Sequence, residues 1–164
     1  MFVHTLLLQY ARYSHWAHKK LFDLINTLSP DQHHTHIPSS FTSLYKTALH
    51  IWGAETLWLS RLKQEIIKIP GDPFEGSMEK LSKALDEADR LWIDWFSNKD
   101  DVQLTEKLQY TNVAGQTFTQ PYDLLLTHIF NHNTYHNGQL VTMLRALGVD
   151  KIPSTDFVTW TRLE

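Results

Sequence analysis

The sequence predicts an all-α protein: a four-helix bundle with long connections and a short extended or hairpin segment before the last helix. Four long segments carry apolar side chains at the spacing of a helix, three or four residues apart. Proline, glycine or polar stretches separate these segments. Hydrophobic residues make up 42% of the chain, which is enough to bury a core between the helices.

The first predicted helix covers about residues 3–28. Leucine, tyrosine and alanine recur there at intervals of three and four, and Ser29-Pro30 ends the pattern. The polar segment 31–40 that follows is predicted to be a loop. Its histidines are therefore expected to be solvated: His33, His34 and His36.

The second predicted helix covers about residues 42–64. Apolar residues occupy almost its whole circumference, which favours a central and largely buried position. Pro70-Gly71-Asp72-Pro73 then breaks the chain. A third helix is predicted over about 77–98, with Ser77 as a suitable N-cap. It has one apolar face and one charged face, and Asp89 is among the charged residues expected to be solvated.

The last third of the chain contains the predicted extended segment and a fourth helix. Between about 106 and 120, apolar and polar residues alternate around Asn112-Val113-Ala114-Gly115, which predicts a short hairpin. Pro121 suits the first turn of a helix over about 121–147, and Gly148 suits its C-terminal stop. Because the connections between helices are long, the sequence leaves their up-and-down order open.

Length and composition narrow the class of protein. Residues 1–164 are expected to form a single bundle domain. The formal charge of -3 and the lack of a basic stripe disfavour a nucleic-acid partner. The absence of cysteine excludes disulfides and thiolate ligands, and it fits a cytoplasmic location. No apolar run approaches the ~20 residues that span a membrane, so no membrane partner is expected.

The strongest functional signal is Asn131-His132-Asn133-Thr134-Tyr135-His136-Asn137-Gly138-Gln139 in the fourth helix. His132 and His136 are four residues apart, about one turn, so both imidazoles project from one face and can bind one metal ion. His128 extends the same stripe, so spacing alone does not choose between the pairs 128/132 and 132/136. His50 in the second helix could complete a three-histidine site across a helix pair.

A metal ion competes with a plainer explanation of these histidines. A single histidine on an apolar face is usually a hydrogen-bonded core residue, but three in one buried stripe are costly to satisfy without a metal. Three imidazoles would leave a position open for water or substrate, as in catalytic zinc sites. Imidazole ligands do not choose between Zn, Ni, Fe and Mn. Asn133 replaces the general-base Glu of the zinc-protease signature, which argues against peptide hydrolysis by that mechanism.

Four other side chains are candidates for supporting the site or contacting substrate. Gln139 lies one helical turn beyond the histidine pair and could hydrogen-bond within the site. Glu55 lies about 140° around the helix from His50, which argues against direct ligation; an arginine partner or a surface position is the alternative. His18 in the first helix is a candidate for a pocket wall, and His128 for a position near the ligands.

Three segments resemble the DinB-like (DinB/YfiT) metalloenzyme superfamily, and together they span nearly the whole chain. Residues 10–21 are similar to the family's Trp-Ala-Asn-x-x-Leu opening, and residues 40–62 are close to its pattern throughout. Residues 128–139 resemble its Asn-His-x-x-x-His-Arg-Gly-Gln block. Asn137 stands in place of the usual Arg and His18 in place of the usual Asn. These two departures leave open whether the chain has the family's activity.

The resemblance implies a homodimeric four-helix bundle that holds a divalent metal ion on His50, His132 and His136. His128 lies in the same block but is not implied as a ligand. Some relatives are transferases in which the metal activates a low-molecular-weight thiol such as bacillithiol or mycothiol. An enzyme that transfers such a thiol to an electrophilic small molecule, in a stress response or detoxification, is therefore implied. Metal-dependent hydrolysis of a small substrate and a non-catalytic, metal-stabilised ligand-binding bundle remain as alternatives, and no catalytic residue is assigned.

Overall fold

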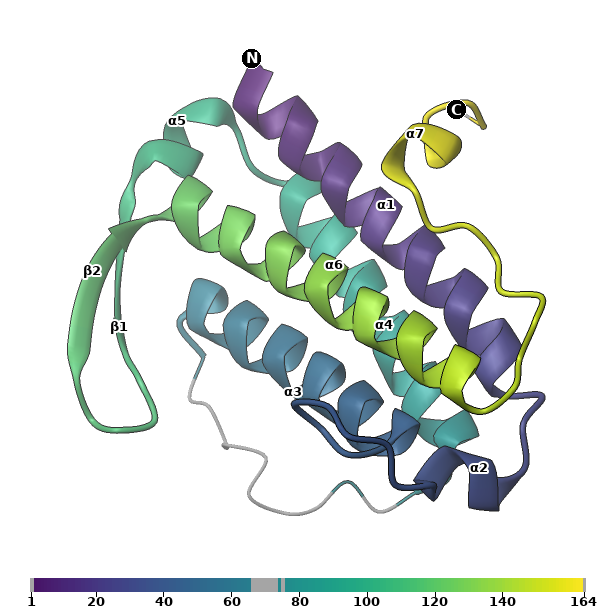
Figure 1. Ribbon diagram of the computed structural model, residues 1–164. Helices are drawn as coiled ribbons and strands as arrows, with labels where there is room; N and C mark the ends of the chain where they lie inside the picture. Colours follow the sequence, from purple (N-terminus) through teal and green to yellow (C-terminus); the bar gives the residue numbers. More distant parts are fainter. Residues whose placement is uncertain (1, 66–73, 75, 164) are drawn as a thin grey trace.

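Four long helices form the bundle that the sequence predicts (Figure 1). The computed structural model describes residues 2–65, 74 and 76–163. The predicted break at Pro70-Gly71-Asp72-Pro73 lies outside the described residues. All four helices begin and end within three residues of their predicted bounds: α1 (Phe2–Ile25), α3 (Leu44–Lys63), α4 (Met78–Ser97) and α6 (Tyr122–Ala146).

The predicted hairpin is confirmed. Strands β1 (Lys107–Thr111) and β2 (Thr117–Pro121) pair antiparallel, with Lys107 opposite Pro121 and Thr111 opposite Thr117. Gly115, in the turn between them, has a φ of 79°, a conformation that costs glycine little because it has no Cβ. The hairpin extends from one end of the bundle (Figure 1).

Three short helices were not predicted: α2 (Pro30–His34), α5 (Asp101–Thr105) and α7 (Phe157–Trp160). Helix α2 corrects the prediction of a loop over 31–40. Ser29 caps it by accepting from the backbone N–H of Gln32. The prediction that His33 is solvated was wrong, because its side chain is buried and Nε2 lies 2.8 Å from the Ile25 carbonyl oxygen.

The packing of the long helices determines their order. Helix α1 packs against α4 and α6, and α3 packs against the same two helices. Leu7 near the start of α1 shares an apolar cluster with Leu62 at the end of α3, Phe96 at the end of α4 and Leu125 near the start of α6. Helices α1 and α6 are therefore parallel to each other and antiparallel to α3 and α4 (Figure 1).

The core includes two large apolar clusters, one toward each end of the bundle, and a smaller one of Tyr13, Ala17 and Trp160. Between the two large clusters, every long helix has at least one buried polar side chain, and four of these side chains, one from each helix, lie close together. We call these residues the polar layer: His18 of α1, Glu55 of α3, Asp89 of α4 and Asn133 of α6. The prediction that Asp89 is solvated was wrong, since it is only 2% exposed.

Local signals fix the ends of the two helices that carry the candidate metal ligands. Ser43 begins α3 by accepting from the Lys46 backbone N–H at 3.2 Å. Helix α6 ends at Ala146; Gly148, two residues further on, has a φ of 81°, and the N–H of Val149 donates to the Leu144 carbonyl. Among the described residues, no helix is both long enough and apolar enough to cross a membrane.

Candidate metal centre

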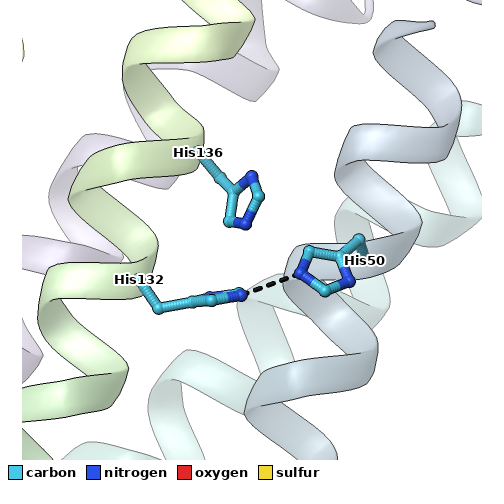
Figure 2. Close-up of side chains that lie close together, drawn as sticks. All are labelled: His50, His132 and His136. Carbon is cyan, nitrogen blue, oxygen red and sulfur yellow. Dashed lines mark hydrogen bonds between the residues drawn. The ribbon is translucent and has the colours of Figure 1, made fainter. Parts of the chain in front are cut away.

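Three histidines from two helices converge on one point (Figure 2). Helix α6 presents His132 and His136 one turn apart, and the antiparallel packing of α3 against α6 brings His50 to face them. The Nε2 atoms of His50 and His132 lie 2.8 Å apart. Each of the three residues offers a ring nitrogen within 4.8 Å of the others. We call these residues the three-histidine cluster.

The cluster fits a divalent metal ion. In a tetrahedral zinc site with Zn–N bonds of about 2.0–2.1 Å, ligand nitrogens lie about 3.3 Å apart. The 2.8 Å between the Nε2 atoms of His50 and His132 is below this value, and the upper limit of 4.8 Å on the separations within the cluster is above it. The pairwise distances between the ring centroids are 4.3, 4.6 and 4.8 Å, so the three rings surround a common point. Small side-chain rotations would bring the three nitrogens into ligating positions.

The surroundings keep the three imidazoles neutral. Burial and, to a smaller extent, the neighbouring His136 lower the pKa of His50 to about 4. Burial also lowers the pKa of His132 to about 4, with added repulsion from His136 and His50. The pKa of His136 is lowered by burial as well. Because only a neutral imidazole can ligate a metal, the cluster is in its ligating protonation state at pH 7.

Gln139 orients His136. The Nδ1 atom of His136 lies 2.7 Å from the Gln139 Oε1, which can accept a hydrogen bond from Nδ1–H and so leave the Nε2 lone pair free to ligate. The Gln139 amide in turn donates from Nε2 to the Ser40 hydroxyl at 2.9 Å and to the Tyr135 hydroxyl at 3.0 Å. Ser40 lies in the segment before α3, and nothing in its local sequence signalled this contact.

An apolar pocket of about 530 Å³ opens beside the cluster. His50 and His132 line it together with aromatic side chains that include Phe41, Trp52 and Trp58. The Phe41 ring stacks on His50 with centroids 4.0 Å apart. Sequence reasoning missed Phe41, because it precedes α3 and belongs to no helical pattern.

His128 and Lys46 also line the apolar pocket. His128 is exposed, and its ring centroid lies 6.1 Å from that of His132 and 5.5 Å from that of Trp58. It is therefore at the mouth of the pocket and outside the three-histidine cluster. Lys46 brings a positive charge to the same pocket, and it was not among the predicted site residues.

Glu55 and His18 belong to the polar layer and not to the three-histidine cluster. Glu55 is 1% exposed and accepts a hydrogen bond from the Asn133 amide, so it has neither of the alternatives expected, an arginine partner or a surface position. The Nδ1 atom of His18 lies 3.0 and 3.1 Å from the two carboxylate oxygens of Asp89. Glu55 and Asp89 also lie close together, and each affects the pKa of the other.

Burial favours the uncharged forms in the polar layer. It raises the pKa of Glu55 to about 8, with a further contribution from Asp89. It likewise raises the pKa of Asp89 to about 8 and lowers that of His18. Asn137, at the position of the family's usual Arg, is 5% exposed, and its Oδ1 has no hydrogen-bond partner among the described residues.

Comparison with known proteins identifies the family and the fold of the chain. The sequence profile of the DinB family matches residues 1–163. Protein DinB of Bacillus subtilis (strain 168) is 26% identical over 153 residues, covering 88% of this chain and 87% of its own. A crystal structure of a DinB-like protein from Bacillus cereus ATCC 10987 has a TM-score of 0.69 at 19% identity, covering 90% of this chain and 94% of that one. For a DinB-like protein from Bacillus subtilis, the TM-score is 0.61 at 16% identity, with 95% and 99% covered. The two structures share the helical fold, and the chain belongs to the DinB family.

Proposed function

We propose that the protein binds a divalent metal ion on His50, His132 and His136 and uses it in a reaction on a small, largely apolar molecule. The observation that carries this proposal is the convergence of three imidazoles from α3 and α6, two of them with nitrogens 2.8 Å apart. Burial keeps these imidazoles neutral, and the apolar pocket reaches two of them. Aromatic walls such as Phe41 and Trp58 suit an apolar or aromatic ligand.

Transfer of a low-molecular-weight thiol to an electrophile is the reaction we favour. A metal ion bound by three imidazoles supplies a Lewis acid that lowers the pKa of a coordinated thiol or water. The chain has no cysteine, so a reacting thiol would come from a co-substrate. Lys46 lies in the pocket, where its charge can attract the carboxylate groups that small biological thiols commonly carry. The family resemblance also implies a homodimer and a role in stress, and the absence of cysteine fits a cytoplasmic location; these stay predictions.

Metal-assisted hydrolysis of a small molecule is the second candidate, and His128 is the observation that favours it. Its exposed ring at the pocket mouth, 6.1 Å from His132 between centroids, could accept a proton from a water molecule. The products separate the two reactions. Thiol transfer forms a thioether, whereas hydrolysis consumes water and leaves the thiol unchanged.

Metal loading followed by a product assay tests the proposal. Protein purified without a histidine tag is stripped with a chelator and loaded separately with Zn²⁺, Ni²⁺, Fe²⁺ or Mn²⁺. It is then incubated with bacillithiol and an aromatic electrophile, and thioether formation is followed by mass spectrometry. We expect turnover in the loaded parent, and in His132→Ala a lower metal content than in the parent and no turnover.

The matched control is His128→Ala, which removes a histidine of the same helix from outside the cluster. It should retain the metal. Equal metal content in His132→Ala and the parent would rule out the three-histidine site. If the loaded parent binds metal but forms neither a thioether nor a hydrolysis product, the three-histidine site is supported and both proposed reactions are excluded.

A further inference from the structure

The polar layer is a second cluster of metal-ligating side chains, built from different residues. His18, Glu55, Asp89 and Asn133 come one from each long helix, and they are 2%, 1%, 2% and 1% exposed. Apolar clusters lie on both sides of them along the bundle. Charged and polar groups at such depth are unfavourable unless they are paired or coordinate an ion.

The three titratable residues of the layer are close enough to share one ion. His18, Glu55 and Asp89 each offer one nitrogen or oxygen, and these atoms lie within 4.8 Å of one another. Asn133 adjoins them, because its amide Nδ2 donates to Glu55 Oε1. Two carboxylates and an imidazole are ligands that suit Zn²⁺, Fe²⁺ and Mn²⁺.

Hydrogen bonds within the layer leave buried atoms unsatisfied. Glu55 Oε2, Asn133 Oδ1 and His18 Nε2 are inaccessible to solvent, and none has a hydrogen-bond partner among the described residues. The carboxylate and amide oxygens are acceptors that need either a proton donor or a cation. A divalent cation would satisfy such oxygens and also balance the charges of two ionised carboxylates in a medium of low dielectric constant.

We propose that His18, Glu55 and Asp89 form a second divalent-cation site in the centre of the bundle, with the Asn133 amide beside it. This site is distinct from the three-histidine cluster, with which it shares no ligand. It takes two ligands from α1 and α4, the helices that contribute nothing to the three-histidine cluster. It does not depend on the function proposed above.

A charged pocket provides a route for a cation to reach this site. The pocket, of about 320 Å³, lies between α1 and α4, and both His18 and Asp89 line it. Asp23, Glu79 and Asp86 also line it. Each of these acids forms an ion pair with a basic side chain of its own helix, so the pocket offers a path for a cation without a net attraction. Among the residues described, the charged pocket and the apolar pocket have no lining residue in common.

A proton shared between Glu55 and Asp89 is the alternative occupant of the layer. The carboxyl groups lie side by side, and the raised pKa of each is consistent with protons being held there when no cation is bound. The two occupants predict different metal contents, so counting bound metal distinguishes them.

Zn²⁺ alone is the probe. Tag-free protein is stripped with a chelator, incubated with excess Zn²⁺, passed through gel filtration and subjected to elemental analysis. We expect about two Zn²⁺ ions per parent chain, one for each ligand set. The double variant His50→Ala, His132→Ala should retain about one ion, because its polar layer is intact. Adding Asp89→Asn to that variant should remove the remaining ion.

Asp94→Asn in the same background is the matched control, because Asp94 is an exposed carboxylate of the same helix. It should leave the remaining ion in place. The proposal is overturned if the double variant holds no Zn²⁺, or if Asp89→Asn and Asp94→Asn retain equal amounts. If the variant with Asp89→Asn does not fold, the double variant His50→Ala, His132→Ala still tests the proposal, because its intact polar layer should hold one Zn²⁺ ion. This result is read without an activity assay, so it is separate from success or failure of the proposed reaction.

Discussion

Gln139 is the residue whose contacts set the orientation of a proposed ligand. Its carbonyl oxygen faces the His136 Nδ1 at 2.7 Å, and its own amide is held by the Ser40 and Tyr135 hydroxyls. Partners of this kind fix the tautomer and the ring plane of a ligating histidine. The half-buried Gln139 would therefore affect the proposed metal ion by orienting His136.

We predict that Gln139→Ala weakens metal affinity about 10–100-fold, the usual cost of removing such a partner. Competition between the protein and a chromophoric chelator for Zn²⁺ measures the change. Asn131→Ala is the control, because Asn131 is an exposed polar residue of the same helix. An affinity for Gln139→Ala that matches that of the control would mean that Gln139 does not orient His136.

Single residues also mark where sequence reasoning succeeded and where it stopped. The four-residue spacing of His132 and His136 was enough to place both rings on one face of a helix. Spacing could not exclude His128, since three histidines shared one stripe, and only the packing of α3 leaves it at the pocket mouth. Asp89 was missed because its local sequence is charged. Its buried neighbours, His18 and Glu55, lie on other helices, so its local sequence does not reveal them.

Helix α6 carries two of the three histidines and contains glycines in two different environments. Gly148 follows the helix with a φ of 81°, a conformation that strains any residue with a Cβ. Gly138 lies inside the helix, and a Cβ added there would meet no atom within 4 Å. The same substitution should therefore have opposite effects at the two positions.

We predict that Gly148→Ala destabilises the protein by about 1 kcal/mol, through strain at the left-handed position. Gly138→Ala should stabilise it by about 0.5–1 kcal/mol, because alanine restricts the unfolded chain and favours the helix. Urea denaturation followed by circular dichroism gives both values. Effects of the same sign would contradict the assignment of one glycine to the helix interior and the other to its end.

At the level of elements, long helices were predictable and single-turn helices were not. The apolar repeats of α1, α3, α4 and α6 extend over many turns, so a few irregular positions did not hide them. Helices α5 and α7 are five and four residues long, too short for a periodic signal. Helix α2 has local signals in its Ser29 cap and Pro30, but the same two residues also suit the end of the preceding helix.

The packing of the whole bundle lets α3 and α6 contribute side chains both to the three-histidine cluster and to the polar layer. Glu55 follows His50 by five positions on α3, so the two side chains point in different directions. His50 faces the apolar pocket, and Glu55 faces the polar layer. On α6, His132 belongs to the three-histidine cluster and the next residue, Asn133, belongs to the polar layer. The up-and-down order that makes this possible could not be predicted, because it depends on packing between distant segments.

The two clusters should give the metal-free protein opposing pH dependences. The pKa values of His50 and His132 fall from 6.5 to about 4 on folding, so the unfolded chain binds more protons between these values. Stability from this source is present above pH 6.5 and is lost as the pH falls toward 4. Glu55 behaves oppositely, because its burial beside Asp89, His18 and Asn133 raises its pKa from 4.5 in the unfolded chain to about 8 in the folded protein. Its contribution is present below pH 4.5 and is lost as the pH rises to about 8.

We therefore predict that chelator-treated parent protein loses stability between pH 6.5 and about 8, where the histidines are neutral in both states and the buried carboxyls give up their protons. Glu55→Gln removes one of these carboxyls while retaining the shape of the side chain, so its stability should fall less steeply over the same interval. Urea midpoints measured across this range, with chelator present throughout, test the difference. Glu79→Gln is the control, because Glu79 is an exposed carboxylate outside both clusters. Gln139→Glu would not serve as a control, because it adds a charge beside His136. Parallel pH profiles for Glu55→Gln, Glu79→Gln and the parent would show that the polar layer does not hold extra protons in the folded state.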